Sequence, residues 1–288
     1  MSSDPGDIPL SDAEFHRVKK RVYDIAGISL SDAKRTLVMS RLTKHVKAHG
    51  QASFGDYLDF LDRSKNDSLD QEFVNALTTN LTRFFREDHH FDHLAEHVGE
   101  LITRKPRVSR AGKPRLRIWS AGCSTGQEPF TIALHLLAKF PELRRWDFKV
   151  LATDIDTAVL ARAATAIYPE QELAGLSRER AALFDRPGDG TIRIPAVARE
   201  LIAFKVLNLM EDWPVKGPFD AIFCRNVVIY FDKATQARIF TRLGKVLAPD
   251  GFLYVGHSEN AAYTESPFKL VGKTVYQMKP TQTARHAA

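Results

Sequence analysis

The sequence predicts an open, doubly wound α/β sheet that is preceded by a small all-α domain and interrupted by an insertion. Three observations lead to this fold class. In the second part of the chain, apolar runs that end in polar residues alternate with segments of helical periodicity, as in a largely parallel sheet. The first part carries only helical patterns. A segment rich in proline and glycine, from about residue 168 to 202, separates two predicted strands and is expected to fold as an insertion.

The helical domain is expected to cover residues 1–80. Ser11 and Glu14 have the spacing of a capping box, and apolar residues then recur at helical spacing until Gly27. Ser31 is the expected cap of a second helix, and later helical patterns cover residues 53–61 and 69–79. Four basic side chains are expected on the outer side of the second helix: Lys34, Arg41, Lys44 and Lys47. The formal charge of +6 is therefore partly a local feature, and a solvated face is its simplest explanation.

The sheet domain is expected to cover residues 81–288, and its first strand runs into a glycine loop. Gly122 and Gly126 supply backbone freedom and allow close approach to a ligand. The loop lacks the G-x-G-x-x-G spacing of a dinucleotide fold, and Glu128 follows it directly. The pattern favours a nucleotide-like cofactor without a pyrophosphate cradle. A plain strand-to-helix turn is the structural alternative.

Polar side chains follow the other predicted strands. Asp154 is placed to accept hydrogen bonds from ribose hydroxyls, whereas Asp156 is expected to be the N-cap of the next helix. Asn208 and the pair Arg225 and Asn226 come at the ends of two further runs, both expected to be buried strands. Because open α/β sheets bind ligands at the carboxyl ends of their strands, these side chains are expected to share one crevice with the glycine loop.

Five separated motifs follow one another along the chain: Thr79–Glu87 (TNLTRFFRE), Ser120–Pro129 (SAGCSTGQEP), Thr153–Asp156 (TDID), Phe223–Asp232 (FCRNVVIYFD) and Gly256–Glu259 (GHSE). Together they closely resemble the CheR family of S-adenosylmethionine-dependent methyltransferases, which esterify glutamates on chemotaxis receptors. The resemblance covers residues from about 11 to 279, in order. It implies a Rossmann-like methyltransferase sheet and an antiparallel β subdomain in the insertion.

The resemblance also implies which residues contact S-adenosylmethionine. Glu128 suits the cationic end of this cofactor, and Asn208 offers a donor and an acceptor to an adenine edge. For Asn80 and Thr82, helix capping is the structural alternative. The implied cofactor-binding residues are Asn80, Thr82, Arg86, Gly122, Glu128, Asp154, Asn208, Leu209, Arg225 and Asn226.

The implied reaction moves a methyl group to a glutamate side chain and leaves S-adenosylhomocysteine. A glutamate has a reference pKa of ~4.3, so at neutral pH the acceptor is already a carboxylate and needs no general base. Positioning and removal of water are then the expected sources of catalysis. Two hypotheses name catalytic residues: Arg86 steers the carboxylate, and Tyr230 donates a hydrogen bond to it. A packed aromatic side chain is the alternative for Tyr230.

The expected partners are chemotaxis receptors, whose acidic methylation helices would be steered by the basic face of the helical domain. Nucleic acid is not expected, because Arg225-Asn-Val-Val stands where amino-methyltransferases of nucleic acids carry Asn-Pro-Pro-Tyr. The segment 186–193 is shorter than the glycine-rich loop of members that tether a receptor tail, so we expect no tethering. A monomer is expected. Methylation of a small acid and a signalling adaptor without turnover are the competing functions.

Several features are expected to be structural. The N-terminal residues lack a signal peptide and no apolar run is long enough for a membrane helix, so a cytoplasmic protein is expected. Cys123 and Cys224 are expected to be reduced and packed. His89, His93 and His97 are spaced to lie on one face of a helix, but no further metal ligands accompany them, so no metal is expected.

Two further segments are given a structural interpretation. Residues 104–115 are expected to be a solvated connector. A hydrolase is excluded because no G-x-S-x-G elbow is present, and the GHSE motif has no assigned role.

Overall fold

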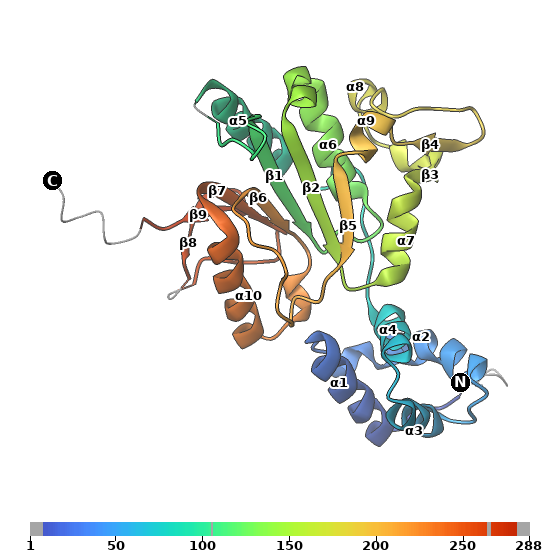
Figure 1. Ribbon diagram of the computed structural model, residues 1–288. Coiled ribbons are helices and arrows are strands. Elements are labelled where there is room, and N and C mark those ends of the chain that lie inside the picture. Colours follow the sequence, from blue (N-terminus) through green and yellow to red (C-terminus); the bar gives the residue numbers. More distant parts are fainter. Residues whose placement is uncertain (1–7, 105, 264–265, 281–288) are drawn as a thin grey trace.

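The computed structural model describes residues 8–104, 106–263 and 266–280, which form a helical domain below a larger α/β domain (Figure 1). The expectation about the N-terminal residues 1–7 lies outside the described part of the chain. Within these residues, no helix combines the length and the apolar character needed to cross a membrane.

The helical domain confirms the predicted helices. Ser11 accepts a hydrogen bond from the backbone of Glu14, whose side chain returns to Ser11, and Gly27 ends the first helix in the left-handed conformation. Ser31 behaves differently from the prediction, because it precedes a 3₁₀ turn over Asp32–Lys34 and makes no side-chain cap. The helices are α1 (Asp12–Ala26), α2 (Arg35–Ala48), α3 (Phe54–Ser64) and α4 (Asp67–Leu77).

The α/β domain is built on a seven-stranded sheet with the order β5-β2-β1-β6-β7-β9-β8. The strands from β5 to β7 are parallel, and β9 and β8 join as an antiparallel pair at one edge. This doubly wound architecture confirms the fold class predicted from the sequence. The strands are β1 (Arg115–Ala121), β2 (Asp147–Asp154), β5 (Ile202–Val206), β6 (Phe219–Cys224), β7 (Leu247–Val255), β8 (Phe268–Gly272) and β9 (Val275–Met278).

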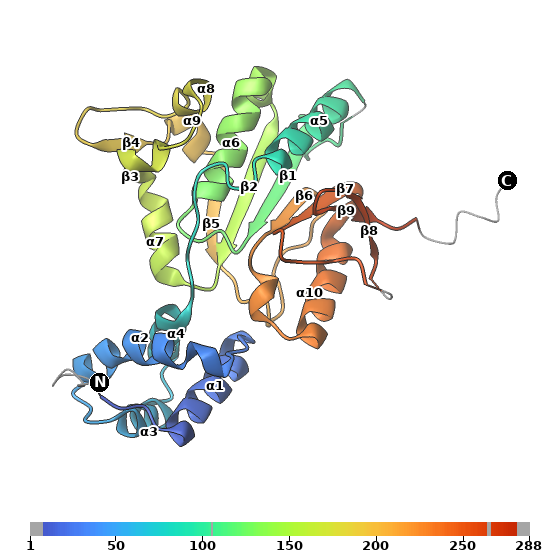
Figure 2. The same cartoon turned by 180° about the vertical axis from the view of Figure 1, so that it is seen from behind.

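Helices cover both faces of the sheet. One core cluster joins α5 and α6 to Ile118 and its neighbours, and a second joins α10 to Trp119 on the opposite side of β1. This alternation follows from the two-residue period of a strand. The linker that follows α4 runs up the sheet domain to the start of α5 (Figure 2). The helices are α5 (His89–Thr103), α6 (Gln127–Lys139), α7 (Thr157–Thr165) and α10 (Lys233–Val246).

The insertion carries the expected antiparallel pair, formed by β3 (Ile167–Pro169) and β4 (Thr191–Arg193). It also holds the short helices α8 (Arg178–Ala181) and α9 (Ala196–Arg199), so it is a mixed rather than an all-β subdomain. The strand that leads out of it departs from the prediction. β5 is an edge strand with exposed positions rather than a buried strand, because β2 is its only partner among the described residues.

Candidate functional site

A pocket of about 460 Å³ lies at the carboxyl ends of the parallel strands, where the helical domain meets the sheet domain. Its volume falls within the roughly 300 to 1,000 Å³ of small-ligand sites, and its place is the one where open α/β sheets bind ligands. The structure brings all the predicted site residues together. They line this pocket from five segments of the chain: Asn80, Thr82, Arg86, Gly122, Glu128, Asp154, Asn208, Leu209, Arg225, Asn226 and Tyr230.

The glycine loop between β1 and α6 has the backbone freedom that the sequence predicted. Gly122 and Gly126 have φ angles of 82° and 94°, which L side chains rarely adopt. At both positions the backbone closely approaches other atoms of the protein, whereas the sequence predicted close approach to a ligand. A Cβ at residue 122 would lie 2.2 Å from a methyl carbon of Val227, and one at residue 126 would lie 2.9 Å from Ala163. The glycines therefore fix the loop against its neighbours and so shape the pocket wall.

Asp154 closes this loop from the end of β2. Its carboxylate accepts hydrogen bonds from the backbone of Ser124 at 2.7 Å and of Asp156 at 3.0 Å. Burial raises the pKa of Asp154, and these backbone donors oppose the shift. Asp156 caps α7 as predicted, by accepting from the amides of Ala158 and Val159. Of these two acids, Asp156 serves as the helix cap and Asp154 lines the pocket.

Two amide side chains of the predicted site also connect the domains. Asn80 donates a hydrogen bond at 2.8 Å to the Asp156 oxygen that also accepts from Thr78. Thr78, not Asn80, is the C-cap of α4, so the capping alternative does not explain Asn80. Asn208 donates to the carbonyl oxygen of Ile25 at 2.8 Å, and its own oxygen accepts from the backbone of Met210. Both polar groups of Asn208 are therefore engaged, and its predicted contact with an adenine edge would compete with the contact to the helical domain.

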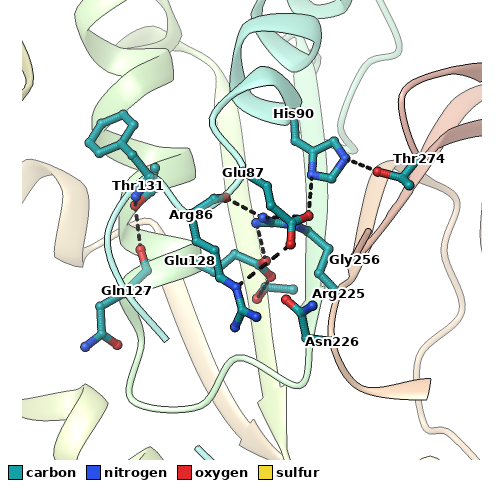
Figure 3. A network of polar contacts seen from close by, with 12 residues as sticks. Arg86, Glu87, His90, Gln127, Glu128, Thr131, Arg225, Asn226, Gly256 and Thr274 are labelled. Carbon is teal, nitrogen blue, oxygen red and sulfur yellow. Dashed lines mark hydrogen bonds and ion pairs between the residues drawn. The ribbon is translucent and has the colours of Figure 1, made fainter. Parts of the chain in front are cut away.

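Arg225 lies at the centre of a buried ionic cluster (Figure 3). It is 6% exposed and its guanidinium is 3.0 Å from Glu128 and 3.4 Å from Glu87. It also donates to the backbone oxygen of Arg86, and Ser120 donates to Glu128 at 2.7 Å. Burial raises the pKa of Glu128, and the positive charge of Arg225 opposes this. One arginine thus holds two carboxylates beside the pocket.

Glu87 belongs to the cluster although it was not predicted as a site residue. Figure 3 shows its carboxylate between Arg225, Arg86 and His90, and the nearest His90 nitrogen is 3.7 Å away. Its backbone φ of 55° lies in the left-handed region, as does that of Phe85 at 54°. Such conformations cost energy in residues other than glycine and gather at functional sites. Its place in the motif TNLTRFFRE was the one signal in the sequence.

Some polar atoms of this cluster lack hydrogen bonds within the described part of the chain. These are Oε2 of Glu87, Nε of Arg225 and Nδ1 of His90, and all three are buried. An unpaired buried group costs roughly 1 to 3 kcal/mol. Arg225 also lines the pocket, so its unpaired donor suits an anionic group of a ligand. A ligand with a carboxylate and a cationic centre would match the arginine and the two glutamates.

Arg86 and Tyr230 stand at the pocket wall nearer to solvent. The side chain of Arg86 is 31% exposed and donates to the backbone oxygen of Leu81 at 2.8 Å. Tyr230 packs against the core of the helical domain, and its backbone oxygen accepts from the amide of Ser29. Tyr230 is therefore partly the packed aromatic residue of the alternative interpretation, although it also lines the pocket.

The helical domain is held firmly against the site. The hydroxyl of Tyr23 donates to Asp232 at 2.6 Å, and Gln71 donates to the backbone oxygen of Ile155. On the predicted basic face, Arg41 donates to the last carbonyl oxygens of α4 and so has a structural task. Lys34 lines the pocket, and Lys44 and Lys47 are exposed. The predicted basic face therefore comprises three exposed lysines, one of which also lines the pocket, and an arginine that binds the end of α4.

The histidines of α5 serve packing. His90 and His97 are buried, and His93 lies 3.0 Å from the hydroxyl of Tyr254. Burial lowers the pKa of His97 to about 4. Among the described residues no group of histidine, cysteine and acidic side chains is arranged to hold a metal ion. Cys123 and Cys224 are free and buried, as predicted, and burial raises the pKa of both thiols.

Comparison with known proteins agrees with this geometry. Residues 80–277 match the family model "CheR methyltransferase, SAM binding domain", and residues 13–78 match "CheR methyltransferase, all-alpha domain". The chemotaxis protein methyltransferase of Escherichia coli is 43% identical, over 94% of this chain and 92% of that protein. The protein of the same name from Salmonella typhimurium is 44% identical over the same shares, and a chemotaxis protein methyltransferase 2 from Pseudomonas aeruginosa is 43% identical over 91% and 92%.

Proposed function

Since the chain belongs to the CheR methyltransferase family, with a SAM-binding domain and the family's all-α domain, we propose that it methylates glutamate side chains of chemotaxis receptors. The products are glutamate methyl esters and S-adenosylhomocysteine. The observation that carries this proposal is the pocket itself. It joins an acid at the end of β2 to an arginine held between two largely buried glutamates, and the helical domain forms its outer wall.

The chain's residues suit S-adenosylmethionine. Asp154 would accept from the ribose hydroxyls, and the unpaired Nε of Arg225 would donate to the α-carboxylate. Glu128 would face the amino and sulfonium charges. Asn80, Thr82, Gly122, Asn208, Leu209 and Asn226 would complete the walls. When bound, this cofactor supplies a methyl group on a cationic sulfur.

Arg86 and Tyr230 are the proposed catalytic residues because they line the pocket near its mouth. Arg86 would steer the acceptor carboxylate by charge, and the Tyr230 hydroxyl would donate a hydrogen bond that fixes its direction. The acceptor is ionised at neutral pH, so no residue needs to remove a proton. A carboxylate oxygen bonds to the methyl carbon as the carbon–sulfur bond breaks, and the electron pair stays on sulfur. Alignment can contribute several kcal/mol to such a step.

The mouth of the pocket favours a protein substrate over a small acid. Leu81 is 81% exposed, and Leu37 and Ile229 also expose apolar surface while they line the same pocket. Exposed apolar side chains gathered at one site mark interaction surfaces. Lys34 and Arg83 add positive charge there. An acidic receptor helix could use both features, with Lys44 and Lys47 of the basic face steering its approach.

The proposal is tested by transfer of radiolabelled methyl from S-adenosylmethionine to the cytoplasmic fragment of a chemoreceptor from the same genome, followed by mild base. We expect label on the receptor that base releases, because esters hydrolyse whereas N-methyl groups persist. Label that survives base would contradict glutamate esterification. Binding of S-adenosylhomocysteine without any transfer would instead favour an adaptor, and transfer only to free carboxylic acids would favour a small-molecule substrate.

A further inference from the structure

The GHSE motif of the sequence forms a tight turn directly behind the pocket. The amide of Glu259 donates to the carbonyl oxygen of Gly256 at 2.9 Å, which closes a four-residue turn after β7. This turn folds the Glu259 side chain back toward the core, where it is 6% exposed. Within the described residues Glu259 does not line the pocket. Its role is therefore to be found in what its carboxylate contacts.

The Glu259 carboxylate accepts four backbone hydrogen bonds. One oxygen accepts from Gly256 at 2.6 Å and from Asn226 at 2.8 Å. The other accepts from Val227 at 2.8 Å and from Ile229 at 3.3 Å. Three of the four donors belong to the loop that carries Arg225 and Asn226 on one side and Tyr230 on the other. A single buried carboxylate thus fixes the backbone of the loop that carries Arg225, Asn226 and Tyr230 of the proposed site.

The rest of the loop is fixed from its other side. Gln236 of α10 donates to the carbonyl oxygens of Val228 and Phe231, both at 2.9 Å. Asn226 has a φ of 58°, which costs energy in a residue with a side chain and persists only where its surroundings enforce it. Gly256 is part of that enforcement, since a Cβ there would lie 2.3 Å from the Asn226 side chain.

We propose that Glu259 is a positioning residue that locks the loop 225–230 in the conformation needed for methyl transfer. It acts through Arg225 and Asn226 at the cofactor end and through Tyr230 at the acceptor end. This inference rests on the proposed function, because it assigns Glu259 to the same reaction. An amide at this position could accept with only one atom, and its NH₂ group would face two N–H donors.

The test compares Glu259→Gln with Asp220→Asn. Asp220 is a matched buried carboxylate: it accepts from the amide of Arg117 at 2.7 Å and from Arg107 at 2.6 Å, at the opposite end of the sheet. Turnover is measured with saturating S-adenosylmethionine and chemoreceptor fragment. Displacement of catalytic groups by 1 Å can cost about 10²-fold, so we expect a loss of that order for Glu259→Gln. Asp220→Asn should stay within about twofold of the parent even where both variants lose thermal stability.

A second measurement distinguishes failure of the role proposed for Glu259 from failure of the proposed methyl transfer. Amide hydrogen exchange of the peptide that covers residues 225–231 needs no activity, and it should become faster in Glu259→Gln but not in Asp220→Asn. If Glu259→Gln does not fold, Gly256→Ala displaces Asn226 while the carboxylate stays, and it should lower turnover and speed exchange likewise. Equal turnover losses in the matched variants, or unchanged exchange in the loop, would overturn the inference. Absence of transfer by the parent protein would count against the proposed function alone.

Discussion

The two ends of the central sheet each place an arginine between two carboxylates, and the difference between them separates structure from function. At the amino ends of the strands, Arg107 pairs with Asp220 and Asp250. At the carboxyl ends, Arg225 pairs with Glu87 and Glu128. The side chain of Arg107 is 31% exposed, whereas that of Arg225 is 2% exposed. Charge pairs alone therefore do not identify a site.

The pairing at the amino end is complete, and that at the carboxyl end is not. Each Asp220 oxygen has a hydrogen-bond donor. In contrast, Nε of Arg225 and Oε2 of Glu87 lack hydrogen bonds within the described residues. Of the seven non-glycine residues with positive φ in the described part of the chain, four lie around the carboxyl end: Phe85, Glu87, Ser124 and Asn226. Nε of Arg115 and Nε2 of His97, near the amino end, also lack hydrogen bonds within the described residues, so unsatisfied groups alone do not mark a site. Strained backbone gathered beside such groups, rather than the ion pairs, is what indicates a ligand.

The largest expected effect comes from replacing the arginine at the centre of the ionic cluster at the carboxyl end. Arg225→Gln should weaken binding of S-adenosylhomocysteine by about 10²-fold, since it removes a charged hydrogen bond worth roughly 1.5 to 3 kcal/mol and leaves two carboxylates beside the ligand. Isothermal titration calorimetry measures this. Arg107→Gln is the matched control and should lose stability but keep its affinity. Equal affinity losses in both variants would show that the two ends of the sheet do not differ in their contribution to ligand binding.

The next effect concerns pH and belongs to the amino end, where His97 lies near Asp250. Burial lowers the pKa of His97 to about 4, and Asp250 opposes the shift. In the unfolded chain the histidine pKa is ~6.5, so between about pH 6.5 and pH 4 this side chain is protonated when the chain is unfolded and neutral when it is folded. The free energy of unfolding therefore falls as the pH drops from about 6.5 toward 4.

Between pH 7 and pH 5 this linkage is worth about 2 kcal/mol. Urea unfolding at both pH values should show that His97→Gln reduces the pH dependence, whereas the same change at the exposed His16 should not. An unchanged pH dependence in His97→Gln would show that His97 is not the group responsible.

A smaller effect is expected for the proposed acceptor contact. Tyr230→Phe removes one hydrogen bond to a charged group, so turnover at saturating substrates should fall by about tenfold while affinity for S-adenosylhomocysteine is kept. Tyr263→Phe is the matched control, because its hydroxyl bonds the backbone oxygen of Ala237 away from the pocket. Unchanged turnover in Tyr230→Phe would leave this residue with its packing role only.

The smallest effect concerns the insertion. A receptor fragment without a C-terminal tail should be methylated within about twofold of one with a tail, since strand addition on the short β3–β4 pair would bury little backbone. Initial rates at equal fragment concentrations measure this. A large gain from the tail would show that the insertion tethers receptors.

Local patterns predicted most of this fold, because each helix and strand signal depends on nearby residues. The capping box, the parallel strands and the acid after β2 all followed from spacing. Features that depend on distant partners did not. Residues 104–115 were predicted to be solvated, yet Arg107 reaches Asp220 far along the chain. The roles of Glu87 and Glu259 likewise depend on contacts that the folded chain creates, such as the hydrogen bonds that Glu259 accepts from the loop 226–229.

The most direct test of the proposed reaction is to map the modification itself. The protein is incubated with the chemoreceptor fragment and S-adenosylmethionine that carries a trideuterated methyl group, and the fragment is then analysed by tandem mass spectrometry. We predict label on glutamate side chains of the receptor, strongly reduced with Arg225→Gln and retained with Arg107→Gln. Label on other side chains, or equal labelling by both arginine variants, would contradict the assignment of the reaction to the carboxyl end of the sheet.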